Sequence, residues 1–341
     1  MSKVGSMKHL RHVIRLPFRL VGTAFALILA ACSGLQGGGM TPTPPTPPPP
    51  GLITEYRVPT INAYPVSVEA GTAGDLWFTE FNSGKIGKIT SSGSIGEYAI
   101  PTVNAQPAGI AEGPDGDLWF TECGGDKIGK ITTDGSITEY PLPTANASPG
   151  DITSGPDGDL WFTEYNADKI GKISTGGAVT EYPIPTANAH PTGITSGPDG
   201  NLWFAEEGGK IGKITTGGSI TEYPVPTANA SPEGIATGPD GDLWFTEYNA
   251  DKIGKISTGG AVTEYPIPTA NASPDRIVAG PDGNLWFTEH ANKIGKITTS
   301  GSITEYPIPT TSAWPDGIAA GPDGDIWFTE ENGDNIAKIV P

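Results

Sequence analysis

Basic side chains, histidine and cysteine are all scarce in this sequence. The 341 residues include 20 Lys and Arg against 38 Asp and Glu, for a formal net charge of −18, with only four His and two Cys. Five of the basic residues and none of the acidic ones precede position 51, so residues 51–341 carry 15 basic against 38 acidic side chains. A body this acidic repels phosphate backbones, which argues against nucleic acid as a partner.

Long helical patterns and long apolar runs are missing as well. No repeat unit after residue 50 offers ten residues of 3.6-residue periodicity free of Gly and Pro, which excludes a helical solenoid. The apolar run at 21–31 is too short to span a bilayer. The 48 Gly, 34 Pro and eight Trp that are present indicate a folded, turn-rich β protein.

The N-terminal residues have the pattern of an export signal. Residues 1–20 are basic without an acid, and the apolar run at 21–31 ends in small residues, as a secretory signal does. The run continues into Cys32 and Ser33, and Leu-Ala-Ala-Cys resembles the bacterial lipoprotein signal, whose cysteine receives the lipid. We predict a signal peptide at 1–31, lipidation of Cys32 and anchoring of the exported protein to the outer membrane. An ordinary signal peptide with an incidental cysteine is the alternative.

Residues 32–50 follow as a predicted tether. They change from Gly-rich to Pro-rich, which indicates a flexible piece and then a stiffer polyproline II spacer. A ligand for a proline-binding domain is the alternative. With Cys32 modified, Cys123 is the only thiol left, which excludes an intrachain disulfide. We therefore expect contact with the membrane through the N-terminal lipid only.

One unit repeats seven times from residue 51 onward. Tryptophan recurs in a Leu/Ile-Trp-Phe-Thr/Ala-Glu motif every 41 or 42 residues, at Trp77, Trp119, Trp161, Trp203, Trp244, Trp286 and Trp327. This period is typical of a propeller blade. In one unit, four β runs at 107–113, 117–122, 127–132 and 136–143 are joined by Gly-rich turns. We predict an all-β, seven-bladed β-propeller over 51–341, with four antiparallel strands in each blade.

A solitary copy of the fourth run, at 52–56, predicts how the ring closes. The first three runs occur seven times, whereas the last unit is not followed by a fourth run of its own. We predict that the N-terminal strand supplies the outer strand of the last blade and latches the ring. An open array, which would leave two strand edges unpaired, is the alternative.

Positions that differ among the repeats indicate the candidate site. In a four-stranded meander, the residues flanking the first-strand proline and the residue after each Phe-Thr/Ala-Glu meet on one rim. In the last three blades these positions bring carboxylates, aromatic faces and an imidazole together, which favours a polar ligand site with stacking walls. The predicted ligand-binding rim comprises Glu233, Asp275, Asp316, Trp314, Tyr165 and Tyr248, together with His290 and Glu331. A solvated acidic rim without a ligand is the alternative.

Positions that do not differ are interpreted as structural. The glutamate that ends the tryptophan motif is the same in all seven units, at Glu80, Glu122, Glu164, Glu206, Glu247, Glu289 and Glu330. We interpret it as part of the blade and not as a metal ring. The recurring Pro-Asp-Gly-Asp/Asn turns supply too few oxygens for calcium and are interpreted as turns. His190, which precedes Pro191, is interpreted as an exposed loop residue.

The repeat resembles that of the streptogramin B lyase family. Its consensus is Y-P-[ILV]-P-T-x-N-A-x-P-x-G-I-x-x-G-P-D-G-x-L-W-F-T-E-x-x-x-x-K-I-G-K-I-T, and the resemblance covers all of 51–341. It implies a seven-bladed propeller, a magnesium ion, and ring opening of cyclic depsipeptide antibiotics by elimination across the ester. In that reaction a base removes the α-proton of the threonyl residue while the metal polarises a neighbouring carbonyl.

Few of the functional residues of that family are matched. Asp275 and Asp316 stand where the family has histidines after the sixth and seventh first-strand prolines, and only Glu331 is retained. At three further positions this chain differs from the family: Trp314 replaces a glutamate, His290 replaces a tryptophan and Val66 replaces a tyrosine. From the resemblance we predict that Asp316 and Glu331 hold magnesium and that His290 and Glu331 are catalytic.

Three functions follow from these observations. The first is a non-catalytic propeller, expected to be a monomer, that binds a small molecule or a cell-envelope protein on the rim. The second is a magnesium-dependent carbon–oxygen lyase that linearises type B streptogramins. The third is a lactonase-type hydrolase, which would add water to an ester. The near-identical repeats and the exchanged imidazoles favour the binding propeller.

Overall fold

The computed structural model describes residues 48–341. The predicted signal peptide, Cys32 and most of the predicted tether lie outside the described residues. Residues Pro49–Pro341 form one compact unit that consists of strands and turns. Among the described residues there is no helix with the length and apolar character needed to cross a membrane.

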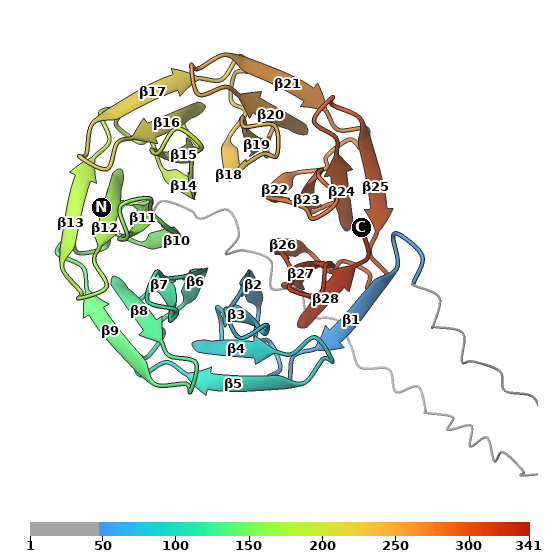
Figure 1. Ribbon diagram of the computed structural model, residues 1–341, viewed down its shortest axis with the longest axis horizontal. Helices are drawn as coiled ribbons and strands as arrows, with labels where there is room; N and C mark the ends of the chain where they lie inside the picture. The colour runs from blue at the N-terminus through green and yellow to red at the C-terminus, as the bar shows by residue number, and fades with distance from the viewer. Residues whose placement is uncertain (1–47) are drawn as a thin grey trace, which may run out of the picture. The chain divides into compact units, whose positions relative to one another are not determined.

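Seven four-stranded antiparallel sheets surround a central axis (Figure 1). Blade 1 contains β2 (Pro65–Ala70), β3 (Leu76–Glu80), β4 (Lys85–Ile89) and β5 (Ile95–Ala99). Blade 2 contains β6 (Pro107–Glu112), β7 (Leu118–Glu122), β8 (Lys127–Ile131) and β9 (Ile137–Pro141). Blade 3 contains β10 (Pro149–Ser154), β11 (Leu160–Glu164), β12 (Lys169–Ile173) and β13 (Val179–Pro183). Blade 4 contains β14 (Pro191–Ser196), β15 (Leu202–Glu206), β16 (Lys210–Ile214) and β17 (Ile220–Pro224).

The remaining blades complete the ring. Blade 5 contains β18 (Pro232–Thr237), β19 (Leu243–Glu247), β20 (Lys252–Ile256) and β21 (Val262–Pro266). Blade 6 contains β22 (Pro274–Ala279), β23 (Leu285–Glu289), β24 (Lys293–Ile297) and β25 (Ile303–Pro307). Blade 7 contains β26 (Pro315–Ala320), β27 (Ile326–Glu330), β28 (Asn335–Ile339) and, as its outer strand, β1 (Ile53–Arg57). The predicted seven-bladed all-β propeller is therefore confirmed.

The hydrophobic core lies between neighbouring blades. Each cluster joins the tryptophan of one blade to the phenylalanine of the next, and Trp327 of blade 7 shares a cluster with Phe78 of blade 1. The ring therefore closes through side-chain packing as well as through β1. The phenylalanine lies close to the neighbouring strand, so that a Cβ added at Gly129 would lie 2.1 Å from Phe120 Cζ. Six blades have glycine at this position, whereas blade 7 has Ala337 opposite Phe328.

In six of the seven blades, all but blade 1, the tryptophan also donates its indole N–H to an aspartate of its own repeat. In blade 2, Trp119 is fully buried and its Nε1 donates to Asp115 Oδ1 over 3.1 Å. Lys130 Nζ lies 5.4 Å from the centre of the indole ring, and Tyr140 stacks on that ring with centroids 5.5 Å apart. The aspartate of the Pro-Asp-Gly turn thus has a structural role, in agreement with its interpretation as turn chemistry.

The closing strand lies one residue from its predicted position. β1 pairs antiparallel with β28, with Ile53 opposite Ile339 and Arg57 opposite Asn335, where the sequence indicated a strand at 52–56. Backbone hydrogen bonds between Gly51 and Val340 and between Val340 and Leu52 extend this pairing. The latched ring is confirmed, because β1 supplies the fourth strand of blade 7.

Candidate functional site

The candidate rim forms where the first strand of each blade begins and the second ends. In every blade the residue after the motif glutamate donates its N–H to the carbonyl of the residue before the proline, as from Glu331 to Trp314 over 3.1 Å. The residue before the proline has a left-handed backbone, with φ of 55° at Trp314 and 57° at Tyr64. The hydrogen bond and the left-handed backbone bring the predicted positions onto one rim, as the meander topology requires.

A chain of three polar side chains joins blades 5 and 6. His290 Nε2 lies 3.2 Å from Asp275 Oδ2, and the two side chains are 3% and 5% exposed. On the other side of the imidazole, Nδ1 hydrogen-bonds Tyr248 Oη over 3.1 Å. Burial and then the charge of Asp275 raise the pKa of Tyr248 to about 12, so the phenol stays protonated at neutral pH. The structure therefore brings three of the predicted residues together.

Trp314 covers this chain from blade 7. Its ring stacks on the imidazole of His290 with centroids 4.4 Å apart and planes inclined by 28°. Tyr248 meets the same imidazole edge-on, with centroids 5.4 Å apart. His290 is thus flanked by aromatic side chains of both neighbouring blades, and its side chain is 3% exposed.

A pair of buried acids lies beside the chain in blade 7. Asp316 is 5% and Glu331 2% exposed. Burial and then the charge of Asp316 raise the pKa of Glu331 well above its ordinary value, and burial and then Asp275 raise the pKa of Asp316. Burial and then the charge of Glu331, which also hydrogen-bonds the phenol, raise the pKa of Tyr64 in blade 1. The cluster therefore extends over blades 5, 6, 7 and 1.

Sequence reasoning missed Tyr64, although a signal for it was present. Tyr64 stands before the first-strand proline of blade 1, the same repeat position that placed Trp314 on the rim. Its ring also contacts Phe81, with centroids 6.3 Å apart. A comparison of all seven residues at this position would have identified it.

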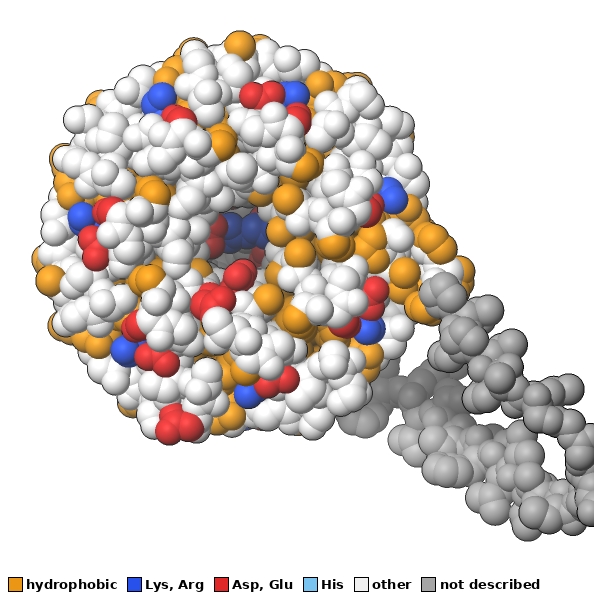
Figure 2. Space-filling view, in the orientation of Figure 1, with side chains coloured by type: hydrophobic (Ala, Val, Ile, Leu, Met, Phe, Trp, Pro, Cys, Tyr) orange, Lys and Arg blue, Asp and Glu red, His pale blue; other side chains and the backbone are white. Residues whose placement is uncertain are grey.

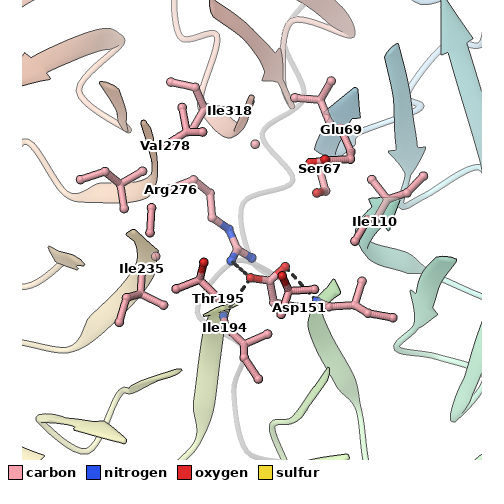
Figure 3. A pocket seen from close by; sticks show the side chains of 18 of the residues that line it. Ser67, Glu69, Ile110, Asp151, Ile194, Thr195, Ile235, Arg276, Val278 and Ile318 are labelled. Carbon is pink, nitrogen blue, oxygen red and sulfur yellow. Dashed lines mark hydrogen bonds and ion pairs between the residues drawn. The ribbon is translucent and has the colours of Figure 1, made fainter. Parts of the chain in front are cut away.

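Arg276, also missed, crosses the central channel beneath these side chains. Its Nε lies 3.6 Å from Asp275 Oδ1 and 3.6 Å from Asp316 Oδ1. Its Nη1 hydrogen-bonds Asp151 Oδ2 of β10 over 3.3 Å, and Figure 3 shows the guanidinium directed at that carboxylate. Burial lowers the pKa of Arg276, but the charges of Asp151, Asp316 and Asp275 outweigh it and raise the pKa above its ordinary value.

The repeats carried a signal for this ion pair too. Asp151 and Arg276 occupy the second position after the first-strand proline, where the other five blades have Ser67, Gly109, Gly193, Gly234 and Gly317. Glycine suits this position because the neighbouring blade is close, and a Cβ added at Gly317 would lie 2.4 Å from the carbonyl oxygen of Val66. Asp151 and Arg276 are thus the two units' departures from the small residues found at this position in the other five units.

A cavity occupies the centre of the ring next to Arg276. Its volume is about 270 Å³, and its wall combines apolar residues such as Ile110 and Ile235 with Glu69, Asp151 and Arg276. Figure 2 shows a hollow at the centre of the ring in which acidic and basic side chains are visible. Burial and then the charges of Glu112 and Asp151 raise the pKa of Glu69 to about 8.

Two predicted rim residues lie outside the His290 cluster. Tyr165 Oη donates to Glu207 Oε2 over 2.7 Å, and its ring stacks on His190 with centroids 4.8 Å apart. His190 is therefore packed against a neighbour and not simply exposed as its sequence position suggested. Glu233 is half-buried in blade 5, and burial followed by the charge of Asp275 raises its pKa well above the ordinary value.

Comparisons with known proteins agree with this architecture. The model of the virginiamycin B lyase family matches residues 48–230 and 207–341. The chain belongs to the virginiamycin B lyase family. Virginiamycin B lyase from Staphylococcus aureus is 43% identical, with a TM-score of 0.82 over 85% of this chain and 99% of that one. A streptogramin B lyase structure is 42% identical, with a TM-score of 0.81 over 84% of this chain and 96% of that one.

A third related structure contains a ligand. It is a catalytically inactive variant of the Staphylococcus aureus virginiamycin B lyase with quinupristin, 42% identical, with a TM-score of 0.82 over 85% of this chain and 99% of the other. No curated protein matches the chain.

The family's magnesium ion does not fit the carboxylates of this site. Magnesium takes ionised carboxylate oxygens and keeps several waters. Asp275 and Asp316 each turn one oxygen toward Arg276 Nε at 3.6 Å, and the other Asp275 oxygen lies 3.2 Å from His290 Nε2. Burial and then the charge of Asp316 raise the pKa of Glu331 well above its ordinary value, which disfavours the ionised form that magnesium takes. Between residues 48 and 341, no three His, Cys, Asp or Glu side chains converge as metal ligands.

The seven motif glutamates form a separate, buried set. All seven are 0% exposed, and burial is the first cause that raises their pKa values to about 7 or 8. Each lies at the end of the second strand of its blade, as does Glu122 at the end of β7. Their burial is in line with the structural interpretation, and it makes the stability of the ring dependent on pH.

Proposed function

We propose that this member of the virginiamycin B lyase family is a binding propeller. Its rim over blades 5, 6, 7 and 1 takes up a compact cyclic peptide, or a ligand of similar build, that carries a cationic group beside an apolar face. The ligand is released unchanged. The observation that carries this proposal is the state of His290, because the imidazole is 3% exposed and has Asp275 at one nitrogen and Tyr248 at the other.

A general base must reach the proton that it removes. The side chain of His290 is 3% exposed and packs against Trp314 and Tyr248, so its position suits a structural link between blades better than proton abstraction. Asp275 stands at a position where the family has an imidazole, and a carboxylate has a lower ordinary pKa than imidazole. The groups able to accept a proton from a bound ligand are therefore fewer and weaker than in the lyases.

Charge and aromatic surface support the ligand chemistry. The cluster joins Asp275 and Asp316 to a single guanidinium, with the carboxyl of Glu331 interacting with Asp316, within a region of 15 basic and 38 acidic residues. An acidic rim attracts cations and repels anions. Half-buried aromatic rings beside it, such as Trp314 and Tyr64, offer faces for stacking and for cation–π contact.

Binding is tested with quinupristin, the ligand of the related inactive variant. Calorimetric titration of the purified protein is expected to give saturable binding to one site. Trp314→Ala is expected to weaken affinity by about tenfold or more, because it removes a stacking wall. Gln106→Ala changes the same repeat position in blade 2 and serves as the matched control, with unchanged affinity. Absence of binding by the unmodified protein up to millimolar ligand overturns the proposal for this ligand class.

Elimination is the second candidate function. The retained Glu331 and the chain from Tyr248 through His290 to Asp275 favour it, because such a chain passes a proton between its ends. Incubation of quinupristin with the protein would then yield a linear product of unchanged mass, and His290→Ala would abolish it. A product heavier by one water would instead indicate the lactonase-type hydrolase.

The cellular location is part of the same proposal. Its support is the basic and apolar signal followed by Leu-Ala-Ala-Cys at 29–32. Metabolic labelling with a tritiated fatty acid is expected to mark the protein, and fractionation is expected to place it in the outer membrane. Cys32→Ala is expected to abolish the label and release the protein from the membrane fraction. A labelled Cys32→Ala variant, or an unlabelled parent protein, contradicts this location.

A further inference from the structure

Arg276 is the only basic side chain among the described residues that line the central cavity. Its guanidinium lies where carboxylates from three blades converge: Asp151 from blade 3, Asp275 from blade 6 and Asp316 from blade 7. The last two are 4% and 5% exposed. Buried carboxylates need a counter-charge, since an isolated buried anion is strongly unfavourable.

Backbone hydrogen bonds position the ion pair between Asp151 and Arg276 across the channel. Asp151 accepts hydrogen bonds from the backbone N–H groups of Ile152 over 3.0 Å and Ile194 over 3.1 Å. This fixes the carboxylate that receives Arg276 Nη1. Both residues are exceptions at a repeat position held elsewhere by serine or glycine, and they face each other across the ring.

We propose that Arg276 is the resident cation of the site and stands in place of a bound metal ion. Guanidinium remains charged throughout the working pH range, and its planar fork reaches several carboxylates at once. Its Nε faces Asp275 and Asp316, whereas its Nη1 is held by Asp151. The site therefore has its positive charge without a divalent ion. This inference concerns the charge of the site and holds whichever ligand the rim binds.

The first test measures divalent-ion binding by the unmodified protein. After treatment with chelator, the protein is titrated with Mn²⁺ and Mg²⁺, and its Tm is recorded at each concentration. A ligand that binds only the native state raises Tm, so no change in Tm and no saturable Mn²⁺ signal are expected. Saturable Mn²⁺ binding that Asp316→Asn removes would overturn the proposal.

The second test exchanges the guanidinium. Arg276→Met keeps the approximate volume and removes the charge, so Tm is expected to fall by roughly 5–15 °C. Millimolar Mg²⁺ or Mn²⁺ is then expected to restore part of the loss, because the carboxylates need another cation. Arg276→Lys is the matched control, which keeps the charge and is expected to retain most of the Tm and to stay insensitive to metal.

Two results with Arg276→Met would contradict the proposal. An Arg276→Met protein with unchanged Tm, or with a lowered Tm that no divalent ion restores, would reduce Arg276 to an ordinary ion pair and overturn it. If Arg276→Met does not fold, Arg276→Met with Asp275→Asn removes one buried anion along with the cation. That double variant is expected to fold and to be more stable than Arg276→Met. Failure of quinupristin binding leaves these outcomes unaffected, so the two proposals are tested separately.

Discussion

Trp314 of blade 7 stacks on His290 of blade 6 with ring centroids 4.4 Å apart. The two residues stand at different positions of the repeat, one before the first-strand proline and one after the motif glutamate. Their contact crosses a blade boundary and closes the imidazole in from one side, whereas Tyr248 closes it in from the other. The site is thus assembled from neighbouring blades, and each blade contributes a different group.

Tyr248→Phe tests the hydrogen bond at the other face of that imidazole. It removes the Oη that lies 3.1 Å from His290 Nδ1 and leaves a buried ring nitrogen without this partner. Loss of one partner of a buried hydrogen bond costs about 1–3 kcal/mol. We expect a decrease of that size in the free energy of unfolding, measured by chemical denaturation. An unchanged value would show that the hydroxyl does not hold His290.

The glycine of the third strand is predicted to matter for packing in blade 2, although blade 7 has Ala337 at the equivalent position. Gly129→Ala places a Cβ 2.1 Å from Phe120 Cζ, and overpacking a core costs about 1–3 kcal/mol or more. The free energy of unfolding should fall by at least that amount. Gly96→Ala on β5 is the matched control, because a Cβ there meets nothing within 4 Å and its effect on stability should be small. Equal effects of the two substitutions would contradict the packing between blades.

The buried motif glutamates predict the pH dependence of stability. Burial raises the pKa of Glu122 in the folded state to about 8 from an ordinary value of 4.5. The folded state therefore binds the proton more tightly than the unfolded state, so this stabilisation is complete below the unfolded pKa and is lost as the pH rises through the folded pKa. We expect Tm to be higher near pH 5.5, about one unit above the unfolded pKa, than near pH 8.5, about half a unit above the folded pKa.

Glu122→Gln is the variant for this prediction. Glutamine resembles the protonated carboxyl, so its Tm should decrease less than that of the parent protein over the same pH interval. Asp134→Asn is the control, since this aspartate is fully exposed and its pKa is lowered by a hydrogen bond from Thr132. A Tm that rises with pH in the parent protein, or identical slopes in parent and Glu122→Gln, would contradict the burial of protonated glutamates.

The latch between the two ends of the ring is open to a cross-linking test. Thr54 lies opposite Lys338 in the pairing of β1 with β28, so the pair Thr54→Cys and Lys338→Cys should form an intrachain disulfide under oxidising conditions. It should raise stability by about 2–4 kcal/mol, because it closes a long loop. Thr54→Cys with Thr138→Cys, on a strand of blade 2, is the control and should remain reduced or form dimers. Dimers alone from the first pair would mean that the ring is open.

Much of the fold was predictable because one pattern repeats. The spacing of Trp77 and its six counterparts gave the number of blades, and the copy of the fourth run at 52–56 gave the closure, since an unpaired edge is unfavourable. The positions of the rim also followed from topology, because strands of a meander alternate in direction. The burial of individual rim side chains could not be predicted from the repeat pattern. The imidazole of His290 is buried because Trp314 and Tyr248, on the two adjacent blades, pack against it.

Contacts across the channel could not be predicted from the repeat pattern. Asp151 and Arg276 are separated by 125 positions and belong to blades that are not neighbours in the ring, so only the closed ring brings them to 3.3 Å. A search for exceptions at each repeat position would have identified both residues. It would not have identified them as partners, because the length of a side chain relative to the width of the channel is a property of the assembled ring.

The most direct test of the binding proposal is a stoichiometric incubation of the protein with quinupristin, followed by separation of protein and ligand and by measurement of the ligand's mass and retention. Ligand that is bound by the protein and recovered with unchanged mass and unchanged retention, with and without Mg²⁺, is the predicted result. A product of unchanged mass but altered retention, lost in His290→Ala, would contradict the binding proposal and establish elimination.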